Sequence, residues 1–449
     1  MIEKYIQKKN ENHGHALGIL KELHDKGFQA LFVGGTVRDM LMDIKSRDFD
    51  IVTDAPMEVI PHLFNCTESE PVGKTFPVFI INGVEVASCR SMERNTPFPV
   101  GDLEQRDLTI NSMAYDPFQD NLMDPFGGQR DLKEKIIRFT GDPESRIAED
   151  PIRMVRACRF LSAIEGRFEN DSLEAIKEHA PKIMNNNMFV RINAEIMKAM
   201  AHKKPSIFFR ALHRTGLLAM IFPSLNRCGE LDGGPYHGET VLEHCLLTGD
   251  ALSPGRPLLR LAGYLHDAGK YDAAEIKDGG LTFIDHEKMT HAVVRDLEKL
   301  GFSTRDVRRI NGLIKTHMRP LKADSTPKAV RRLISFLKEH NITWKEFMRM
   351  RIADKSANLA KSPYNPGDIK LRVLKIHGEL NKTSKNAFTL KDLALTGRDV
   401  MEILSIPQGR AVGKAMQDMF DMVMENPEMN SREKLKGHLT THWKGKYHG

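Results

Sequence analysis

The sequence predicts an α+β fold, in which a small head with a mixed sheet and helices is followed by mostly α-helical parts. Between about residues 28 and 140, short apolar runs alternate with turn residues, which is typical of strands mixed with a few helices. Beyond about residue 144, apolar residues recur at helical spacing, and the third region is also rich in histidine. The predicted domains are residues 1–140, 141–226, 227–385 and 386–449.

Each element follows from a local pattern. Residues 2–27 have the spacing of an amphipathic helix that ends at Gly27. Strands are expected in QALFVGG, DFDIVT, FPVFIING and VEVASCR, and helices in PIRMVRACRFLSAI, INAEIMKAMA and SIFFRALHRTGLLAMIF. The polar, glycine-rich segment RCGELDGGPYHG predicts a linker before the third region. The final residues, SREKLKGHLTTHWKGKYHG, indicate a basic helical tail.

The composition excludes several classes of protein. Of 449 residues, 41% are hydrophobic and 28% charged, which allows real cores and excludes disorder over most of the chain. No run of apolar residues is long enough to span a membrane. Five cysteines without a CxxC motif argue against a zinc finger or a disulfide framework and predict a reducing cytoplasm. A net charge of +6 is compatible with a polyanionic partner, and no protein partner is implied.

The first candidate site is the segment LFVGGTVRD, in which an apolar strand runs into paired glycines and a helix. Gly34 and Gly35 let the backbone approach a ligand closely. The start of the following helix favours a phosphate, and Arg38 adds a positive charge. The alternative is an ordinary tight connection between a strand and a helix.

The second candidate site is a pair of carboxylates, Asp48 and Asp50, in the run RDFDIVTD. Residues two apart in a strand lie on one face, so these carboxylates repel each other unless a cation binds between them. Oxygen ligands of this kind favour Mg²⁺. Glu85 is expected as a third carboxylate, because its two valine neighbours would face the core. The alternative is a solvated strand edge.

GGTVRD followed by DFD resembles the head of class II tRNA nucleotidyltransferases, the CCA-adding enzymes, and of the related bacterial poly(A) polymerases. Further motifs similar to that family follow in order, namely GKTFPVF (73–79), RDLTINSMAYD (106–116), DPFGGQRDL (124–132) and EDPIRMVRACRF (149–160). The resemblance covers about residues 25–225. It implies a polymerase-β-like nucleotidyltransferase head, with a neck that selects the nucleotide.

The resemblance implies template-independent addition of CCA to tRNA 3′ ends from CTP and ATP. Asp48, Asp50 and Glu85 would be catalytic, and the two aspartates would hold two Mg²⁺ ions. The implied partners are tRNA, CTP and ATP, without a membrane. The predicted nucleotide-binding residues are Gly34, Gly35, Arg38, Arg106, Asp107, Asn111, Asp150, Arg153, Arg156 and Arg159.

Asp150 and Arg153 are expected to choose the base. Pro151 fits the first position of a helix, which puts these two side chains near one another at i, i+3. A carboxylate accepts from the exocyclic amine of cytosine or adenine, and a guanidinium donates to the ring, so the pair would oppose GTP and UTP. The alternative is that Asp150 only caps the helix and Arg153 is solvated.

The segment SMERNTPFPVGDLEQ (91–105) bears on which nucleotides are added. In CCA-adding enzymes a flexible loop at this place switches between CTP and ATP. Here the segment is short for the family, and Pro97 and Pro99 would stiffen it. Enzymes that add only CC resemble this departure, so CC-only addition is an alternative, as is a bacterial poly(A) polymerase.

The third region resembles the HD phosphohydrolase superfamily. An adjacent His-Asp pair lies between an upstream histidine and a downstream aspartate, and two more histidines fall where a second metal would need ligands. Imidazole and carboxylate together suit Mn²⁺ or Ni²⁺. In related enzymes such a domain is associated with phosphatase and 2′,3′-cyclic phosphodiesterase activity. The predicted ligands are His244, His266, Asp267, His286, His317 and Asp354.

The tail segment 395–416 has two glycine-centred turns around short helices, and it looks like the segment by which the family holds tRNA. Glycine amides and basic side chains would meet RNA phosphates. The predicted contacts are Arg398, Gly409, Arg410, Gly413 and Lys414. The alternative for the tail is a basic solvated hairpin. For the whole chain, two further alternatives are an HD hydrolase with an inactive head and a non-enzymatic RNA-binding module.

Overall fold

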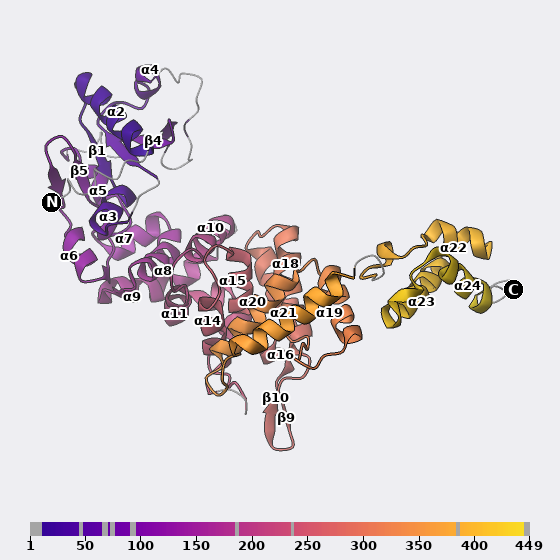
Figure 1. Ribbon diagram of the computed structural model, residues 1–449. Helices are drawn as coiled ribbons and strands as arrows, with labels where there is room; N and C mark the ends of the chain where they lie inside the picture. Colours follow the sequence, from indigo (N-terminus) through magenta and orange to yellow (C-terminus); the bar gives the residue numbers. More distant parts are fainter. Residues whose placement is uncertain are drawn as a thin grey trace. The chain divides into compact units, whose positions relative to one another are not determined.

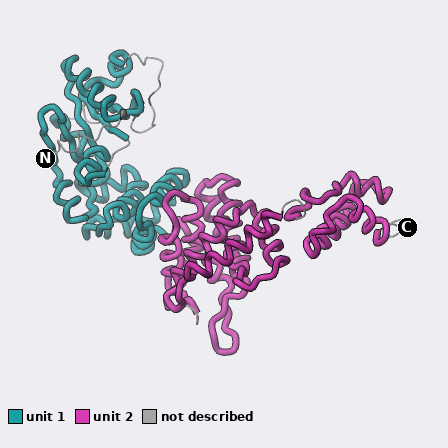
Figure 2. Tube along the Cα trace, in the orientation of Figure 1, with its two compact units in different colours: residues 1–220 teal, residues 221–449 magenta. Residues whose placement is uncertain are grey.

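The computed structural model describes residues 11–44, 48–64, 71, 77–89, 96–184, 188–234, 238–382 and 387–443. The chain forms two compact units, residues 1–220 and 221–449 (Figure 2). A mixed sheet with helices is followed by helical parts, so the predicted α+β class is confirmed. The finer division into four domains stays a prediction.

The head of unit 1 is a six-stranded mixed sheet in the order β3-β4-β2-β1-β5-β6. β2 and β4 are parallel, and the other neighbours are antiparallel. Figure 1 labels β1, β4 and β5 of this sheet. The strands are β1 (Ala30–Val33), β2 (Asp50–Thr53), β3 (Phe79–Ile81), β4 (Val84–Ser88), β5 (Ala114–Asp116) and β6 (Asn121–Met123).

The sheet is buried on both faces. Its central strands carry apolar side chains at successive positions, and these point to the two faces in turn. Phe32 and Ile51 pack in one cluster with Leu20 of α2 (Glu11–Asp25). Leu31 and Val52 pack in a second cluster that includes Cys89 and Leu103 of α5 (Val100–Glu104). The central strands therefore hold the sheet rigidly, and their ends can present polar side chains in fixed positions.

Helices account for the rest of unit 1. The predicted helix at 2–27 is found as α2 within the described residues, and residues 2–10 of that prediction lie outside them. α8 packs against both α10 and α11. β7 (Ile136–Ile137) and β8 (Arg167–Phe168) form a short parallel pair. The helices are α2 (Glu11–Asp25), α3 (Gly35–Leu41), α4 (Ile60–Leu63), α5 (Val100–Glu104), η1 (Thr109–Asn111), α6 (Gly128–Lys133), α7 (Pro143–Glu149), α8 (Ile152–Ile164), α9 (Asn170–His179), η2 (Ala180–Ile183), α10 (Phe189–Ala199), α11 (Ser206–Arg214) and α12 (Leu217–Ile221).

Unit 2 is helical apart from a hairpin of β9 (Glu275–Lys277) and β10 (Gly280–Thr282). α14 packs against α15 and α20, and α15 packs against α18. Among the helices of the described residues, none combines the length and hydropathy that crossing a membrane requires. The helices before the tail are α13 (Pro223–Asn226), α14 (Val241–Asp250), α15 (Pro257–Leu265), α16 (Lys270–Ala273), η4 (His286–Lys288), α17 (His291–Lys299), α18 (Thr304–Thr316), α19 (Pro327–Glu339), α20 (Trp344–Ala357) and α21 (Pro366–Leu380).

The tail has a core of its own, built from apolar residues of three helices that include Val400, Met419 and Leu435. It is tied to α19 by Arg331, whose buried guanidinium donates to the carbonyls of Met424 and Glu425. The tail elements are η5 (Leu390–Asp392), α22 (Gly397–Leu404), α23 (Arg410–Glu425), η6 (Pro427–Met429) and α24 (Arg432–His442).

One predicted detail of the tail is wrong. Gly413 lies inside α23, which begins at Arg410 and runs for 16 residues. Its amide donates to the carbonyl of Gly409 at 3.4 Å, so it is used within the helix rather than offered to a phosphate. Arg398, Arg410 and Lys414 are exposed.

Gly128→Ala tests how the DPFGG motif supports the head. A Cβ at Gly128 would lie 2.2 Å from the carbonyl oxygen of Thr109, which belongs to backbone. We expect the free energy of unfolding to fall by about 1–3 kcal/mol, as for other overpacked positions. Gly18→Ala in α2 is the matched control, since a Cβ there meets nothing within 4 Å and should stabilise the helix by up to about 1 kcal/mol. Denaturant unfolding of both variants checks the contrast, and equal stability of the two would contradict it.

Candidate functional site

Unit 1 contains a cavity of about 480 Å³ bordered by the head, α8 and α10. All ten predicted nucleotide-binding residues and both predicted metal-binding aspartates line it. Glu85 does not belong to the lining. The lining residues are Gly34, Gly35, Arg38, Asp48, Asp50, Arg106, Asp107, Asn111, Asp150, Arg153, Arg156, Arg159, Phe160, Arg191 and Lys198.

The glycine pair lies where any side chain would obstruct the cavity. Gly34 has φ +64°, a conformation that favours glycine. A Cβ on it would lie 2.6 Å from Nη1 of Arg106 and 3.5 Å from Oδ2 of Asp50, and one on Gly35 would also lie 3.5 Å from that oxygen. The turn thus places backbone atoms without a side chain beside the carboxylate of Asp50 and the guanidinium of Arg106.

Three carboxylates lie close together at the edge of this cavity. Asp50 begins β2 and is in direct register with Glu85 of β4, as the sequence predicted for a neighbouring strand. Phe49 is buried in the core, which directs its two aspartate neighbours to the other side. Burial raises the pKa of Asp50, and the charge of Asp48 adds to this, while Arg106 and Arg38 oppose it.

The chemistry of this carboxylate group fits a divalent cation. Burial and the charges of Asp50 and Asp48 also raise the pKa of Glu85. Mutual repulsion of this kind is relieved when a cation binds, and oxygen-only ligands suit Mg²⁺. Asp48 and Asp50 are the residues that would hold it.

A second network fixes the side of the cavity that faces α8. Asp107 accepts from Nε of Arg156 at 2.7 Å and from Nδ2 of Asn111 at 2.9 Å. Asn111 in turn accepts from Nη1 of Arg38 at 2.7 Å. Although Asp107 is buried, the charge of Arg156 and these hydrogen bonds hold its pKa well below the usual range. These connected hydrogen bonds therefore fix the side chains of Arg38 and Asn111 relative to each other.

The expected side-chain pair of Asp150 and Arg153 is not present. Asp150 directly follows α7 and forms a bidentate ion pair with Arg191 of α10, with distances of 2.6 and 2.9 Å. Arg153 is buried and donates to Glu149 at 2.7 Å and to the carbonyl of Gln105 at 3.0 Å. Both side chains line the cavity, but each is oriented by a different partner.

Sequence reasoning missed three lining residues of this cavity, and also Glu195 beside them. Arg191, Glu195 and Lys198 of α10 recur at i, i+4 and i+7, so they share one helix face. That spacing of polar residues in an apolar helix could have indicated from the sequence that they face a site. Glu195 pairs with Arg159, and Phe160 lies under Arg159 with 4.0 Å between the guanidinium carbon and the ring centroid. An aromatic face and several cations thus meet in one place.

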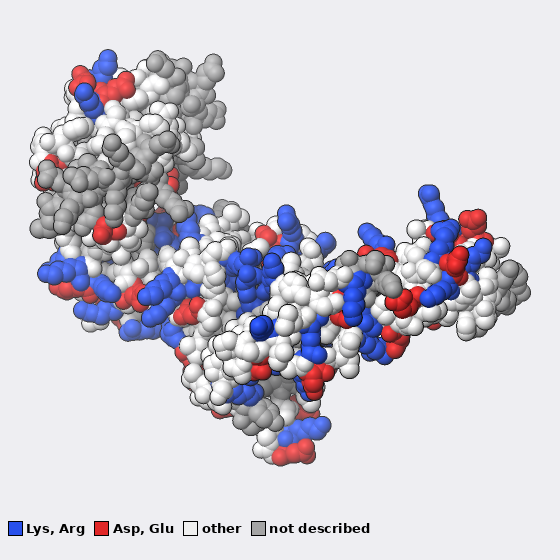
Figure 3. Space-filling view, viewed as in Figure 1, with Lys and Arg blue, Asp and Glu red and all other residues white. Residues whose placement is uncertain are grey.

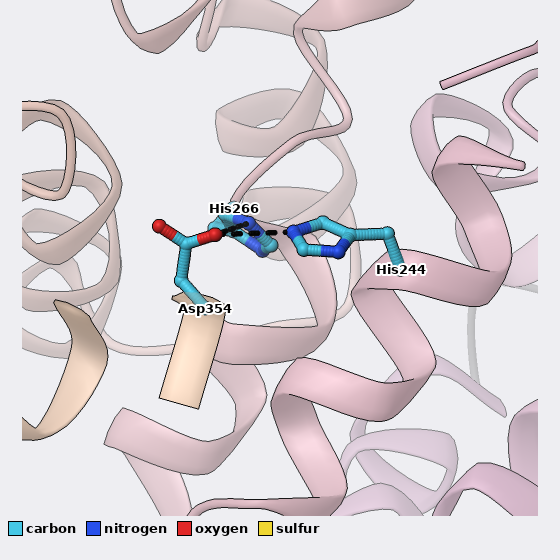
Figure 4. Close-up of side chains that lie close together, drawn as sticks. All are labelled: His244, His266 and Asp354. Carbon is cyan, nitrogen blue, oxygen red and sulfur yellow. Dashed lines mark hydrogen bonds and ion pairs between the residues drawn. The ribbon is translucent and has the colours of Figure 1, made fainter. Parts of the chain in front are cut away.

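Unit 2 contains a second cluster, of imidazoles and carboxylates. Two groups of side chains there have ligand atoms within 4.8 Å of one another, His244 with His266 and Asp354, and His266 with Asp267 and His317. Figure 4 shows both imidazoles of the first group directed toward the carboxylate of Asp354. Five of the six predicted HD ligands therefore converge, from α14, α15, α18 and α20 and the residues that directly follow them. The sixth, His286 of η4, lies 3.0 Å from Asp267.

Each histidine of this cluster has its Nδ1 engaged elsewhere, which leaves Nε2 directed toward the centre. Nδ1 of His266, His286 and His317 contacts a backbone carbonyl at 2.9, 2.9 and 2.6 Å. Nδ1 of His244 contacts Glu239 at 3.0 Å, a partner that sequence reasoning missed. Such outer hydrogen bonds fix the tautomer that metal ligands need.

The second cluster also fits a metal ion. Nε2 of His266 is buried and has no hydrogen-bond partner among the described residues, although Asp267 and Asp354 lie 3.4 and 3.9 Å away. Burial lowers the pKa of His266 to about 3, so its imidazole is neutral at pH 7. Neutral imidazole is the form that binds a metal. Lys270 forms an ion pair of 2.8 Å with Asp267 and lines an adjacent cavity of about 510 Å³.

Two segments of the chain match known families. Residues 30–138 match the family described as the Poly A polymerase head domain. Residues 167–228 match the family described as a probable RNA and SrmB-binding site of polymerase A. The first segment includes the glycine pair and the three carboxylates.

Named relatives cover different shares of the chain. Poly(A) polymerase I of Haemophilus influenzae is 32% identical over 47% of this chain and 52% of its own length. The Multifunctional CCA protein of Methylococcus capsulatus is 33% identical over 54% of this chain and 61% of its own length. The chain thus spans about half to three fifths of these relatives. An A-adding tRNA nucleotidyltransferase of Deinococcus radiodurans is 27% identical over 87% of this chain and 91% of its own length.

The fold also has a solved counterpart. The crystal structure of the Bacillus stearothermophilus CCA-adding enzyme in complex with CTP covers 96% of this chain and 98% of its own, with a TM-score of 0.67. At 24% identity, this likeness concerns the fold.

Asp107→Asn tests the network beside α8. The variant keeps the shape of the side chain but removes the charge that holds Arg156, so we expect a loss of about 2–3 kcal/mol in the free energy of unfolding at pH 7. Because the folded pKa is lowered, this contribution is fully present above the unfolded pKa of about 4 and is lost progressively as the pH falls below it toward the folded pKa. Urea unfolding between pH 3 and 7 checks this. The exposed Asp25→Asn is the control, and a pH-independent difference would contradict the prediction.

Proposed function

We propose that this chain is a template-independent tRNA nucleotidyltransferase that adds CCA to tRNA 3′ ends from CTP and ATP. The proposal depends most on one observation, the single cavity in which Gly34, Gly35, Asp48 and Asp50 meet the basic residues of α8 and α10. Seven cationic side chains line that cavity, which suits a triphosphate. The match of residues 30–138 to a polymerase head family supports the same activity.

Each part of the cavity has a proposed task. Asp48 and Asp50, with Glu85 beside them, hold Mg²⁺, which when bound activates the attacking hydroxyl and stabilises the leaving pyrophosphate. The backbone at Gly34 and Gly35 and the guanidinium of Arg38 bind the phosphates. Arg106, Asp107 and Asn111 fix the sugar. Arg156 and Arg159 add positive charge, and Phe160 provides a flat surface for the base.

Asp150 and Arg153 remain the proposed base-selecting residues, in a changed arrangement. Arg191 holds the carboxylate of Asp150 in a bidentate pair, and Glu149 holds the guanidinium of Arg153. Each group is thereby fixed before the nucleotide binds. A fixed acceptor and a fixed donor distinguish cytosine and adenine from guanine and uracil by their hydrogen-bonding edges.

Related activities compete with full CCA addition. The relative that matches over most of its length is named as A-adding, which favours addition of the terminal A alone as a second candidate. The relative named Poly(A) polymerase I favours long A-tails. CC-only addition was the alternative drawn from segment 91–105, of which residues 91–95 lie outside the described residues.

Incubation with defined tRNA ends separates these activities. A tRNA that ends before CCA receives CTP alone or CTP with ATP, and a tRNA that ends in CC receives ATP. We expect two added residues with CTP and three with both nucleotides. Asp48→Ala and Asp50→Ala should each lower the rate by about 1,000-fold or more, because several kcal/mol of transition-state stabilisation by the cation is lost. Product length and single-turnover rates on gels are the measurements.

Glu58→Ala is the matched control, because it removes an exposed carboxylate of the head outside the cavity. Its rate should equal that of the wild type. Full activity in the Asp48→Ala and Asp50→Ala variants would contradict the proposal. Extension only of the CC-ended tRNA would replace it with A addition.

We also propose that unit 2 holds a divalent transition metal, such as Mn²⁺ or Ni²⁺, and hydrolyses phosphoesters. The converging Nε2 atoms and the unpartnered Nε2 of His266 support this. When bound, the metal supplies a water of lowered pKa. Lys270, at the wall of the adjacent cavity, would steady the phosphate. Phosphate monoesters and 2′,3′-cyclic phosphates are the proposed substrates.

In the tail, we propose that Arg398, Arg410 and Lys414 contact tRNA phosphates, with the backbone at Gly409. Their exposure supports this assignment. A cytoplasmic location is proposed from the cysteine pattern, since the five cysteines form no CxxC motif and the four among the described residues are buried.

His266→Ala tests the metal cluster of unit 2. We expect calorimetric titration with Mn²⁺ or Ni²⁺ to show affinity reduced by about 100-fold or more, because one ligand is removed from a preformed set. The metal-induced rise in unfolding temperature should also disappear. His291→Ala, which removes an exposed histidine outside the cluster, should bind metal like the wild type. Unchanged affinity in His266→Ala would refute the metal assignment.

A further inference from the structure

A basic groove lies along α18 in unit 2, apart from the metal cluster. Its cavity measures about 710 Å³. Positions 305, 308, 309, 312 and 315 of α18 line it, and their spacing puts them on one helix face. Four of these five residues are Arg or Lys. Figure 3 shows Lys and Arg side chains around the region that Figure 1 labels α18.

Three of the four cations have no internal partner in the described part of the chain. Arg305, Arg308 and Lys315 form no ion pair or hydrogen bond with a described residue. Arg309 differs, because it pairs with Glu346 and donates to the carbonyl of Asn341 at 3.2 Å. Arg309 therefore builds the groove wall, and the other three cations are available to a ligand.

The floor of the groove holds an unpaired acceptor. Oδ1 of Asn311 is buried and has no hydrogen-bond partner among the described residues. Beside it, a Cβ on Gly312 would lie 2.8 Å from the carbonyl oxygen of His340, so glycine lets the end of α19 approach closely. A buried oxygen without a donor is costly, and a hydroxyl group of a ligand would satisfy it.

We propose that this groove binds the sugar-phosphate backbone of RNA. The cations meet phosphates, and the oxygen of Asn311 accepts from a ribose 2′-hydroxyl, the group that distinguishes RNA from DNA. This inference rests on the proposed function, since it assigns the groove to the tRNA substrate. It adds a contact surface outside the tail and outside the cavity of unit 1.

The length of the cationic face favours a chain of phosphates over one small anion. Arg305 and Lys315 are ten residues apart, which corresponds to about 15 Å along a helix. A single phosphate group cannot contact both ends of such a face. Glu339 is the acidic residue of the lining, so the groove is positive but not uniformly so.

The test compares two variants with equal charge change. Arg305→Glu/Arg308→Glu removes positive charge from the groove, and Arg295→Glu/Lys370→Glu removes it from exposed positions elsewhere in unit 2. Filter binding measures the Kd for a tRNA that lacks CCA, at several salt concentrations. We expect the groove variant to bind at least about tenfold more weakly than the control, with a shallower dependence of log Kd on log salt.

Asn311→Ala tests the proposed hydrogen bond separately from the charge of the groove. It should weaken tRNA binding about threefold without a change in salt dependence, because a neutral hydrogen bond is lost. Arg305→Gln/Arg308→Gln serves as a milder variant if charge reversal impairs folding, which thermal unfolding would reveal. All variants should bind CTP like the wild type by calorimetry.

The outcomes separate this inference from the proposed function. If the wild type extends tRNA and the groove variants bind it like the control, the groove assignment is overturned. If the wild type binds tRNA and the groove variants bind it weakly but no nucleotide is added by any of them, the groove stands and the proposed transfer activity fails. If the wild type binds no tRNA, both fail.

Discussion

In unit 1, the fold holds carboxylates of like charge close together, and the site depends on this constraint. Parallel pairing of β2 and β4 sets Asp50 directly beside Glu85, and Phe49 is fixed in the core, which determines where its aspartate neighbours lie. The sheet cannot relax this arrangement, because its strands are buried on both faces. Burial and repulsion raise the pKa values of Asp50 and Glu85 together. The fold therefore imposes a cost that a bound cation offsets.

Unit 2 also holds potential metal ligands close together, but its donor atoms differ from those of unit 1. Its cluster combines imidazoles with carboxylates, and each histidine is held through Nδ1, which directs Nε2 toward the centre. Oxygen atoms alone favour Mg²⁺, whereas nitrogen and oxygen together favour transition metals. The two clusters thus differ in the metal that their donor atoms would favour. In both, the fold fixes the donor atoms in advance, by strand register in one and by hydrogen bonds from backbone carbonyls and Glu239 to the imidazoles in the other.

Local patterns predicted what depends on local geometry. The alternation of DFD predicted that both aspartates share one strand face, and the valines around Glu85 made it the expected third carboxylate; the structure adds its register beside Asp50. The pairing of Asp150 failed because Arg191, its partner, lies 41 positions away on another helix, which i, i+3 spacing cannot reveal. The role of Gly413 failed because a glycine resembles a turn in sequence, although α23 continues through it. Glu239, which orients His244 from five residues before it, had no motif to mark it.

The cations of this chain divide into those with internal partners and those without. In the cavity of unit 1, Arg156 and Arg191 are each held by a buried or partly buried carboxylate. Such pairs fix geometry, and they leave little net charge to attract a distant polyanion. On α18, Arg305 and Arg308 have no such partner in the described part of the chain, so their full charge acts on solvent. Paired cations are therefore suited to positioning a small substrate. Unpaired cations are suited to binding a long, flexible polyanion, and that binding weakens as the salt concentration rises.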